Sequence, residues 1–164
     1  VRGRTEHAVV YDVMRDEMFY ASRGGGAFMN QKRIRVSART SLENAVVATA
    51  FPFRQRGRLQ AYARLFQAMF ARTEDFRRAG TASLDLAWVA AGRLDAYYEV
   101  GLKAWDVSAG ALLVREAGGV VMDFTGQDKV EESDTIVAAP YKLMTSIQQL
   151  IDKHWQPGKK KGSE

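Results

Sequence analysis

Between residues 80 and 124 the sequence alternates between helical and extended patterns, and glycines separate the segments. Residues 82–91 and 106–117 predict helices, and residues 95–100 and 119–124 predict strands. Helices that alternate with short apolar strands have to cover a sheet, because neither kind of segment can bury its apolar residues alone. This pattern excludes a purely helical or purely β fold.

The remaining segments predict β-hairpins before the alternating part and one further strand and helix after it. An apolar run that ends at Pro52 predicts a buried strand, and an aromatic row from Leu59 to Phe70 predicts an amphipathic helix. The expected fold is therefore an α/β (α+β) domain with a mixed sheet covered by helices. The further expected elements are a hairpin of 6–13 and 18–22, strands at 32–36, 45–51 and 135–139, and a closing helix at 141–154.

Three consecutive glycines at 24–26 could belong to a phosphate-binding loop. Such a loop leads into a helix and carries a Gly-Lys-Ser/Thr sequence, and this segment has neither. The triplet is better interpreted as a flexible turn.

Cysteine is absent, and the two histidines, His7 and His154, lie at opposite ends of the chain. A disulfide scaffold, a cysteine nucleophile and a thiolate metal site are therefore excluded. A zinc site or a Ser-His-Asp triad has few residues from which to be built. Any catalysis has to rely on carboxylates, which favour hard ions such as magnesium.

Charge is divided unevenly along the chain. Residues 1–80 contain 15 Lys and Arg against 7 Asp and Glu, and residues 81–164 contain 9 against 12. The acidic half is where metal chemistry is expected, and the basic half could bind an anionic partner. The alternative is a surface of solvated arginines, with Arg54, Arg56, Arg58 and Arg64 as the densest group.

Three elements in residues 80–106 carry polar groups that could meet in one site. Gly80, Thr81 and Ala82 begin a helix, whose free N–H groups favour anions or sugar hydroxyls. Glu99 lies on an otherwise apolar strand, and Asp106 is expected to open a helix as its N-cap. Each also has an ordinary structural interpretation, as a capped helix, a strand-edge acid and a capping aspartate.

Residues 105–110, Trp-Asp-Val-Ser-Ala-Gly, and residues 116–119, Glu-Ala-Gly-Gly, resemble the C-terminal signature of the inositol monophosphatase family. Residues 3–12 and 23–30 resemble the bacterial SuhB-like branch of that family. The resemblance covers about residues 3 to 155. It implies the layered αβαβα sandwich shared by inositol monophosphatases and fructose-1,6-bisphosphatases.

By this resemblance Asp106 would bind Mg²⁺, Gly80, Thr81 and Ala82 would line the sugar, and Glu99 would accept hydrogen bonds from its hydroxyls. The family's other metal ligands belong to a Gly-Glu-Glu segment and a D-P-x-D-G-T motif, which do not occur in this sequence. We therefore expect residues 1–155 to form the C-terminal part of the family's domain, without its N-terminal metal-binding segment, and residues 156–164 to form a basic tail. No catalytic residue is assigned within the chain.

The resemblance implies a magnesium-dependent phosphatase that hydrolyses inositol monophosphates, with this chain inactive on its own. An alternative is a factor for transcription antitermination and ribosomal RNA maturation, with RNA polymerase or antitermination factors as partners. A related phosphatase acting on phosphoadenosine nucleotides or fructose bisphosphate is a third possibility. We further expect a cytoplasmic homodimer without a membrane span, and apolar surface exposed on the first sheet.

Overall fold

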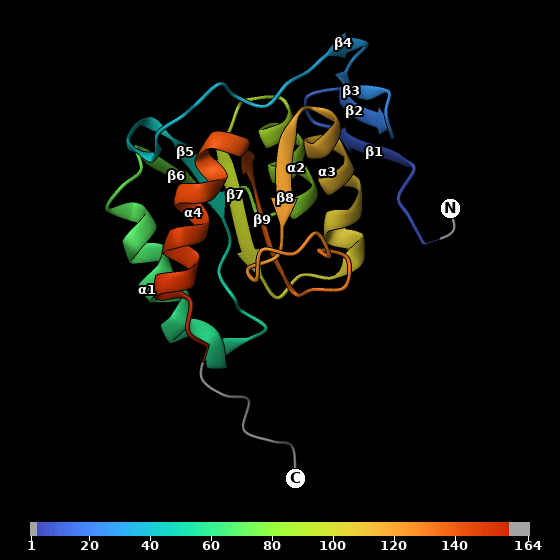
Figure 1. The fold of residues 1–164 in the computed structure, drawn as a ribbon. Coiled ribbons are helices and arrows are strands. Elements are labelled where there is room, and N and C mark those ends of the chain that lie inside the picture. Colours follow the sequence, from blue (N-terminus) through green and yellow to red (C-terminus); the bar gives the residue numbers. More distant parts are fainter. Residues whose placement is uncertain (1–2, 158–164) are drawn as a thin grey trace.

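Two β-sheets separated by a pair of helices form the centre of the protein in a computed structural model that describes residues 3–157 (Figure 1). The first sheet is antiparallel and has the strand order β1-β2-β3-β4. Tight turns join its strands, as the early hairpin pattern predicts. The strands are β1 (His7–Asp12), β2 (Glu17–Ser22), β3 (Gly26–Met29) and β4 (Lys32–Arg33).

The second sheet has five strands in the order β6-β5-β7-β9-β8. Strand β5 pairs in parallel with β6 and β7, whereas β9 pairs antiparallel with β7 and β8. The prediction of a mixed sheet is confirmed. The strands are β5 (Val46–Thr49), β6 (Asp75–Arg77), β7 (Ala96–Val100), β8 (Gly119–Met122) and β9 (Thr135–Pro140).

Four α-helices complete the layers in the described part of the chain, which also contains two short 3-10 helices, Leu42–Asn44 and Arg56–Arg58. Helices α2 (Ala82–Ala90) and α3 (Ala104–Glu116) lie between the two sheets, and α1 (Leu59–Phe70) and α4 (Tyr141–His154) cover the other face of the second sheet (Figure 1). The resulting order of sheet, helices, sheet, helices matches four successive layers of the expected αβαβα sandwich. Within residues 3–157 no helix has the length and apolar character that crossing a bilayer requires.

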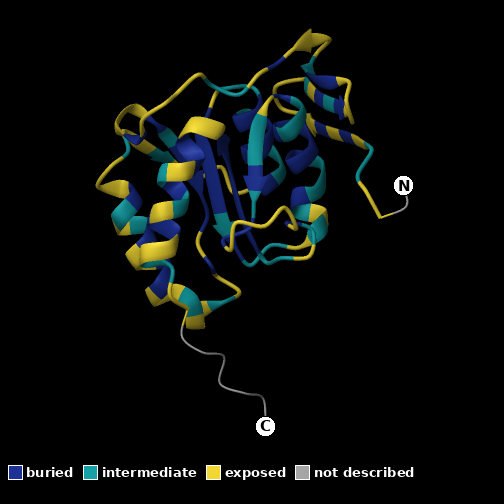
Figure 2. Cartoon of the chain, in the orientation of Figure 1, coloured by how far each residue is buried: buried dark blue, intermediate teal, exposed yellow. Residues whose placement is uncertain are grey.

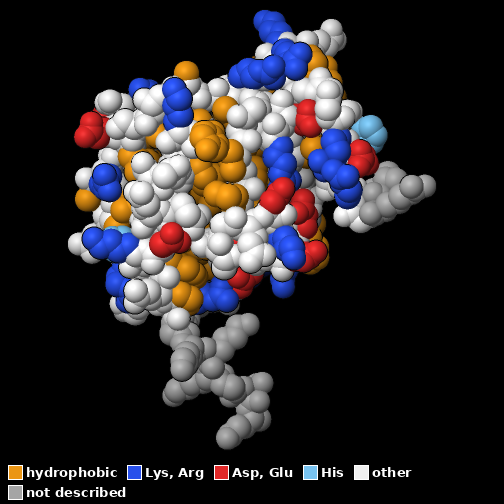
Figure 3. All heavy atoms as spheres, in the orientation of Figure 1, with side chains coloured by type: hydrophobic (Ala, Val, Ile, Leu, Met, Phe, Trp, Pro, Cys, Tyr) orange, Lys and Arg blue, Asp and Glu red, His pale blue; other side chains and the backbone are white. Residues whose placement is uncertain are grey.

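Apolar side chains fill both spaces beside the second sheet, whose central strands are buried at most positions (Figure 2). One cluster joins the first sheet, α2, α3 and the second sheet, and includes Phe19, Leu86 and Tyr97. The other joins the second sheet to α1 and α4 and includes Leu65 and Ile147. Hydrophobic side chains also gather between α4 and β8 on the face that Figure 3 shows, and basic side chains gather around β4.

The glycine triplet binds a carboxylate of the same chain. The backbone N–H groups of Gly24 and Gly26 each donate to a carboxylate oxygen of Glu116, at 2.8 Å. Glu116 ends α3, so these bonds fix the helix to the edge of the first sheet. These two N–H groups are therefore occupied by Glu116 and are not available to a phosphate.

Three local differences separate the structure from the sequence prediction. The predicted strand at 32–36 is only the two-residue β4, because only Lys32 and Arg33 pair with the short strand β3. Strands β3 and β6 were not predicted, since each has only a few residues and the alternation that signals a strand needs more. Both are fixed by pairing with a longer neighbour.

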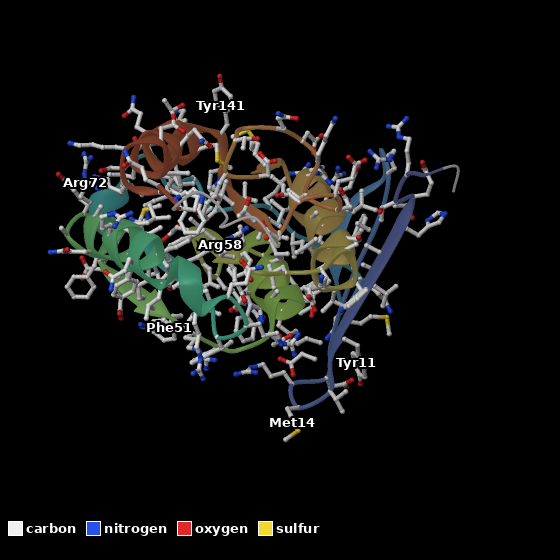
Figure 4. All side chains as sticks on the ribbon, turned by 90° about the horizontal axis from the view of Figure 1, so that it is seen from below. Tyr11, Met14, Phe51, Arg58, Arg72 and Tyr141 are labelled. Atoms are coloured by element: carbon white, nitrogen blue, oxygen red, sulfur yellow. The ribbon has the colours of Figure 1, made fainter. Side chains whose placement is uncertain are left out.

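The outer face of the first sheet is apolar and exposed, as expected. Val9, Tyr11 and Met18 are 62%, 47% and 45% exposed, and Tyr11 lies directly opposite Met18 across the β1–β2 pair. Figure 4 shows Tyr11 and Met14 near one end of β1, away from the helices. The alternate residues of the same strands face α2 and α3 and are buried.

Gly110 determines how closely α2 and α3 approach. A Cβ atom at this position would lie 2.5 Å from Cβ of Leu86 on α2, which is closer than two carbon atoms can pack. We expect Gly110→Ala to lower the free energy of unfolding by about 1–3 kcal/mol, because the two helices would have to separate. Urea denaturation monitored by circular dichroism measures this change.

Gly57→Ala is the matched control, because a Cβ atom there would meet nothing within 4 Å. An unchanged stability of Gly110→Ala would show that α2 and α3 can move apart without cost, and the close contact would then have no structural importance.

Candidate functional site

One open cavity of about 400 Å³ contains all five site residues that the sequence predicts. It lies where the loop after β5, the segment before α2, the end of β7 and the start of α3 meet. The structure thus brings together residues that are up to 26 positions apart in the sequence. The predicted residues lining the cavity are Gly80, Thr81, Ala82, Glu99 and Asp106.

Gly80 and Thr81 aim the start of α2 at the cavity. Gly80 has a φ of +92°, a left-handed conformation that a residue with a side chain rarely adopts. Thr81 occupies the predicted N-cap position but makes no capping bond with its side chain, and its hydroxyl lies 3.2 Å from that of Ser83. The first N–H groups of α2 and the Thr81 hydroxyl are therefore suited to bind ligand oxygens.

Glu99 is half-buried on β7, and its carboxylate accepts a hydrogen bond from the hydroxyl of Tyr97, two residues earlier on the same strand face. Burial raises the pKa of Glu99, and the nearby Asp106 carboxylate raises it further, while the Tyr97 bond and the Arg78 guanidinium oppose the rise. Glu99 therefore combines one fixed oxygen with a second that can accept hydrogen bonds from a ligand.

Asp106 differs from the prediction in its position on the helix. It is not the N-cap of α3: the helix begins at Ala104 after the N-cap Lys103, and Asp106 is the third helical residue. One of its carboxylate oxygens accepts the backbone N–H of Lys103 at 2.9 Å, as an acidic residue at this position does in a capping box. The predicted N-cap position was wrong, because Asp106 caps the backbone of Lys103 from inside the first turn of the helix.

The residues present do not form a complete magnesium site. Asp106 offers one oxygen that no hydrogen bond occupies among the described residues, but residues 3–157 contain no cluster of three or more His, Cys, Asp or Glu placed to hold a metal ion. Mg²⁺ is usually held by more than one carboxylate together with substrate oxygens. The described part of the chain thus supplies one candidate ligand, Asp106.

Aromatic side chains and an arginine form the rim of the cavity, and the sequence analysis did not assign them to the site. The Arg78 guanidinium lies over the rings of Phe51 and Phe53, at 6.0 and 5.6 Å from their centroids. Trp105 also lines the cavity and is 79% exposed. The sequence shows Trp105 beside Asp106, whereas the exposure of Trp105 and the stacking of Arg78 on Phe51 and Phe53 depend on the fold.

Asp85, also unassigned by sequence, lies behind the cavity on the first turns of α2. It is 1% exposed, and neither of its carboxylate oxygens has a hydrogen-bond partner among the described residues. Burial raises its pKa to about 7, and the Glu99 carboxylate contributes to the rise while Arg78 opposes it. The sequence signal was an acid between the apolar residues Leu84 and Leu86.

The profile of the inositol monophosphatase family matches residues 1–156. The chain belongs to the inositol monophosphatase family. Its resemblance to the SuhB-like branch is also confirmed, because curated relatives named "Nus factor SuhB" are about half identical to it. The relative from Pseudomonas aeruginosa is 51% identical over 98% of this chain and 60% of its own length, and that from Escherichia coli K12 is 50% identical over 90% and 55%.

Solved structures of this family share the fold. The extragenic suppressor protein suhB from Bartonella henselae superposes with a TM-score of 0.89 at 40% identity, covering 93% of this chain and 58% of its own. Inositol monophosphatase from Anabaena gives 0.87 at 32% identity, with 96% and 65% covered. The chain spans between one half and two thirds of the length of these inositol monophosphatase family members.

Asp85 predicts an unusual pH dependence of stability. Its folded-state pKa of about 7 lies above the ordinary value of 3.8, so the free energy of unfolding falls as the pH rises from 4 to 7 and then stays low. Asp85→Asn removes this penalty, and we expect it to stabilise the protein by up to roughly 4 kcal/mol at pH 8 and by little at pH 4.

Urea denaturation at both pH values measures the effect. Glu43→Gln, at an exposed acid in the turn Leu42–Asn44, is the control for the loss of one negative charge. Equal stability changes for Asp85→Asn at pH 4 and pH 8 would contradict a neutral, buried Asp85.

Proposed function

We propose that the protein acts in transcription as a factor of the Nus type. The observation that carries this proposal is the 51% identity to a Pseudomonas aeruginosa protein named "Nus factor SuhB", over nearly the whole of this chain. Relatives with the same name in Escherichia coli K12 and Vibrio cholerae support it, at 50% and 48% identity. The proposed partners are RNA polymerase and antitermination factors.

An exposed apolar and basic surface beside the cavity suits such a partner. Phe51, Pro52, Phe53, Arg56 and Leu59 line a shallow hollow of about 440 Å³, which we call the FPF hollow. Phe51 and Phe53 are 43% and 63% exposed and lie side by side, with ring centroids 5.9 Å apart, and adjacent exposed apolar side chains mark interaction sites. Aromatic anchors flanked by arginines are typical of protein–protein interfaces.

Only part of the arginine cluster predicted from the sequence is available to a partner. Arg58 forms an ion pair with Asp134 at 2.8 Å, and Arg64 donates to the backbone oxygen of Gln156 at 2.9 Å. Figure 4 shows Arg58 over the middle of the molecule and Phe51 at its edge. Arg54 and Arg56 are exposed and form no ion pair with any described residue, so their charge faces solvent.

We expect the double variant Arg54→Glu, Arg56→Glu to weaken binding to an antitermination complex that contains RNA polymerase by about tenfold or more, because two attractive charges become repulsive. Biolayer interferometry with the purified complex at two salt concentrations measures the loss. The difference in affinity between the double variant and the unmodified protein should become smaller at the higher salt concentration, because salt screens the charges.

The matched control is Arg72→Glu, Lys142→Glu, which changes the net charge equally at two exposed positions that line neither the FPF hollow nor the cavity, whereas Arg56 lines the hollow and Arg54 the adjoining cavity. If both double variants lose the same affinity, the interaction depends on net charge and not on the FPF hollow. If neither loses affinity, Arg54 and Arg56 are solvated side chains without a partner.

We also propose that the whole protein is a magnesium-dependent phosphatase for a polyol phosphate such as inositol monophosphate. The convergence of the five predicted residues in one cavity favours this second function. Glu99 and the start of α2 would bind the hydroxyls, and Asp106 would contribute one ligand to Mg²⁺. This proposal excludes catalysis by the described residues alone, because they lack a full ligand set.

The 164-residue chain by itself should release no phosphate from inositol 1-phosphate above the level of its Asp106→Asn variant, with or without Mg²⁺. Metal-assisted attack of water requires the metal to be fixed in place, and one carboxylate fixes it poorly. A colorimetric phosphate assay measures the release. Magnesium-dependent release that Asp106→Asn abolishes would show that the chain holds a complete site.

A further inference from the structure

We propose that Asp134 is a positioning residue that holds two walls of the cavity together and so allows the cavity to bind a polyol. This inference rests on the proposed polyol-binding role of the cavity. Asp134 itself does not line the cavity and would touch no ligand. It acts through hydrogen bonds and an ion pair to the loop after β5 and to the segment between β7 and α3.

The backbone of Asp134 holds the first wall. Strand β7 leads into α3 through Gly101 and Leu102, and both residues line the cavity. Asp134 directly precedes β9, which pairs antiparallel with β7. Its backbone oxygen accepts the N–H of Gly101 at 2.6 Å and that of Leu102 at 3.4 Å. Asp134 is therefore fixed to the segment that follows Glu99.

The side chain of Asp134 holds the second wall. Its Oδ2 atom accepts a hydrogen bond from Nε2 of Gln55 at 3.2 Å and forms an ion pair with Arg58 at 2.8 Å. Both partners belong to the segment after β5: Gln55 lines the cavity, and Arg58 is the N-cap of α1. We call the contacts of Asp134 with Gln55, Arg58, Gly101 and Leu102 the Asp134 bridge.

The two walls meet where Gln55 packs against Gly101. A Cβ atom at Gly101 would lie 3.5 Å from both Cδ and Nε2 of Gln55, so the amide of Gln55 covers the backbone of this glycine. The φ of Gly101 is +93°, a conformation that favours glycine. Because Asp134 bonds to the Gln55 amide and to the Gly101 N–H, it holds the two sides of this contact together.

The loop after β5 is tightly turned, so a restraint on Gln55 also restrains the aromatic rings of the loop. The N–H of Gln55 bonds to the oxygen of Pro52 at 2.9 Å, and the N–H of Phe53 bonds to the oxygen of Phe51 at 2.8 Å. The rings of Phe51 and Phe53 in turn lie under the Arg78 guanidinium. The Asp134 bridge therefore fixes the position of the whole rim formed by these rings and Arg78.

The strength of the Asp134 bridge suits a positioning role more than a role in stability. The side chains of Arg58 and Asp134 are 23% and 41% exposed, and solvent weakens an ion pair of this kind. Loss of the Asp134 side chain should therefore leave the domain folded. It should release Gln55 and the end of the loop, and a polyol would then have to order this wall when it binds.

Amide hydrogen exchange of the full chain, measured by NMR, tests the bridge without a ligand. Asp134→Ala removes the side-chain contacts and keeps the backbone bonds to Gly101 and Leu102. Exchange of the Gln55 and Arg58 amides should become about threefold or more faster, because the loop opens more often, while the Gly101 amide should change little. Unchanged exchange at Gln55 and Arg58 overturns the inference.

Asp128→Ala is the matched control. Asp128 lies between β8 and β9, as Asp134 does, and its carboxylate forms an ion pair with Arg115, but it does not line the cavity. The control loses the same charge and one ion pair to an arginine. It should leave exchange at Gln55 and Arg58 unchanged.

Binding of myo-inositol, followed by the amide shifts of Thr81 and Ala82, tests the consequence. Asp134→Ala should weaken the affinity by about threefold to tenfold, the range that a partly exposed ion pair and one hydrogen bond can supply. Its urea midpoint should match that of Asp128→Ala. Adding Arg58→Met to Asp134→Ala should weaken binding no further, because the partner of Arg58 is already gone.

The outcomes separate the positioning role from the polyol site. An affinity that Asp134→Ala leaves unchanged, or that Asp128→Ala weakens equally, overturns the positioning role while the polyol site stands. A loss of affinity that grows when Arg58→Met is added also overturns it, because the two side chains would then act separately. No binding of myo-inositol by the unmodified chain overturns the polyol site, and with it the positioning role.

Discussion

The contact between α2 and α3, enclosed by a sheet on each side, is the constraint on which the rest of the structure depends. The helices approach so closely that Gly110 has no space for a Cβ atom beside Leu86. This contact lies one turn from Asp106 on α3 and directly after Asp85 on α2. The distance between the two helix starts, and hence the width of the cavity between them, therefore depends on a core contact and not on a loop.

A site formed by the N-termini of rigid helices can hold several carboxyl groups close together only if some of them are protonated while others are ionised. Asp106 is fixed by the backbone N–H of Lys103, Glu99 by the hydroxyl of Tyr97, and Asp85 by no described donor at all. The Tyr97 donor favours the charged form of Glu99, whereas no described donor does so for Asp85. Glu99 and Asp106, which accept hydrogen bonds, line the cavity, and Asp85, which accepts none from a described residue, lies behind it.

The sequence predicted the layers and the five cavity residues because these depend on signals that are local or carried by a specific motif. Helices α2 and α3 are bounded by glycines, and the Trp105–Gly110 segment is characteristic of the family. The sequence did not predict strand β6, the stacking of Arg78 on Phe51 and Phe53, or the lack of a described hydrogen-bond donor for Asp85. Each of these depends on which distant segment becomes the neighbour, and one sequence contains no signal for that.

The FPF hollow and the cavity share a wall, so the two proposed functions are physically connected. Phe51 and Phe53 line both, and Arg78 stacks on the two rings from the cavity side. A partner that fills the hollow would therefore contact the same two rings on which Arg78 stacks. Since the charge of Arg78 lowers the pKa of both Glu99 and Asp85, a partner at the hollow and a ligand in the cavity would act on one shared guanidinium.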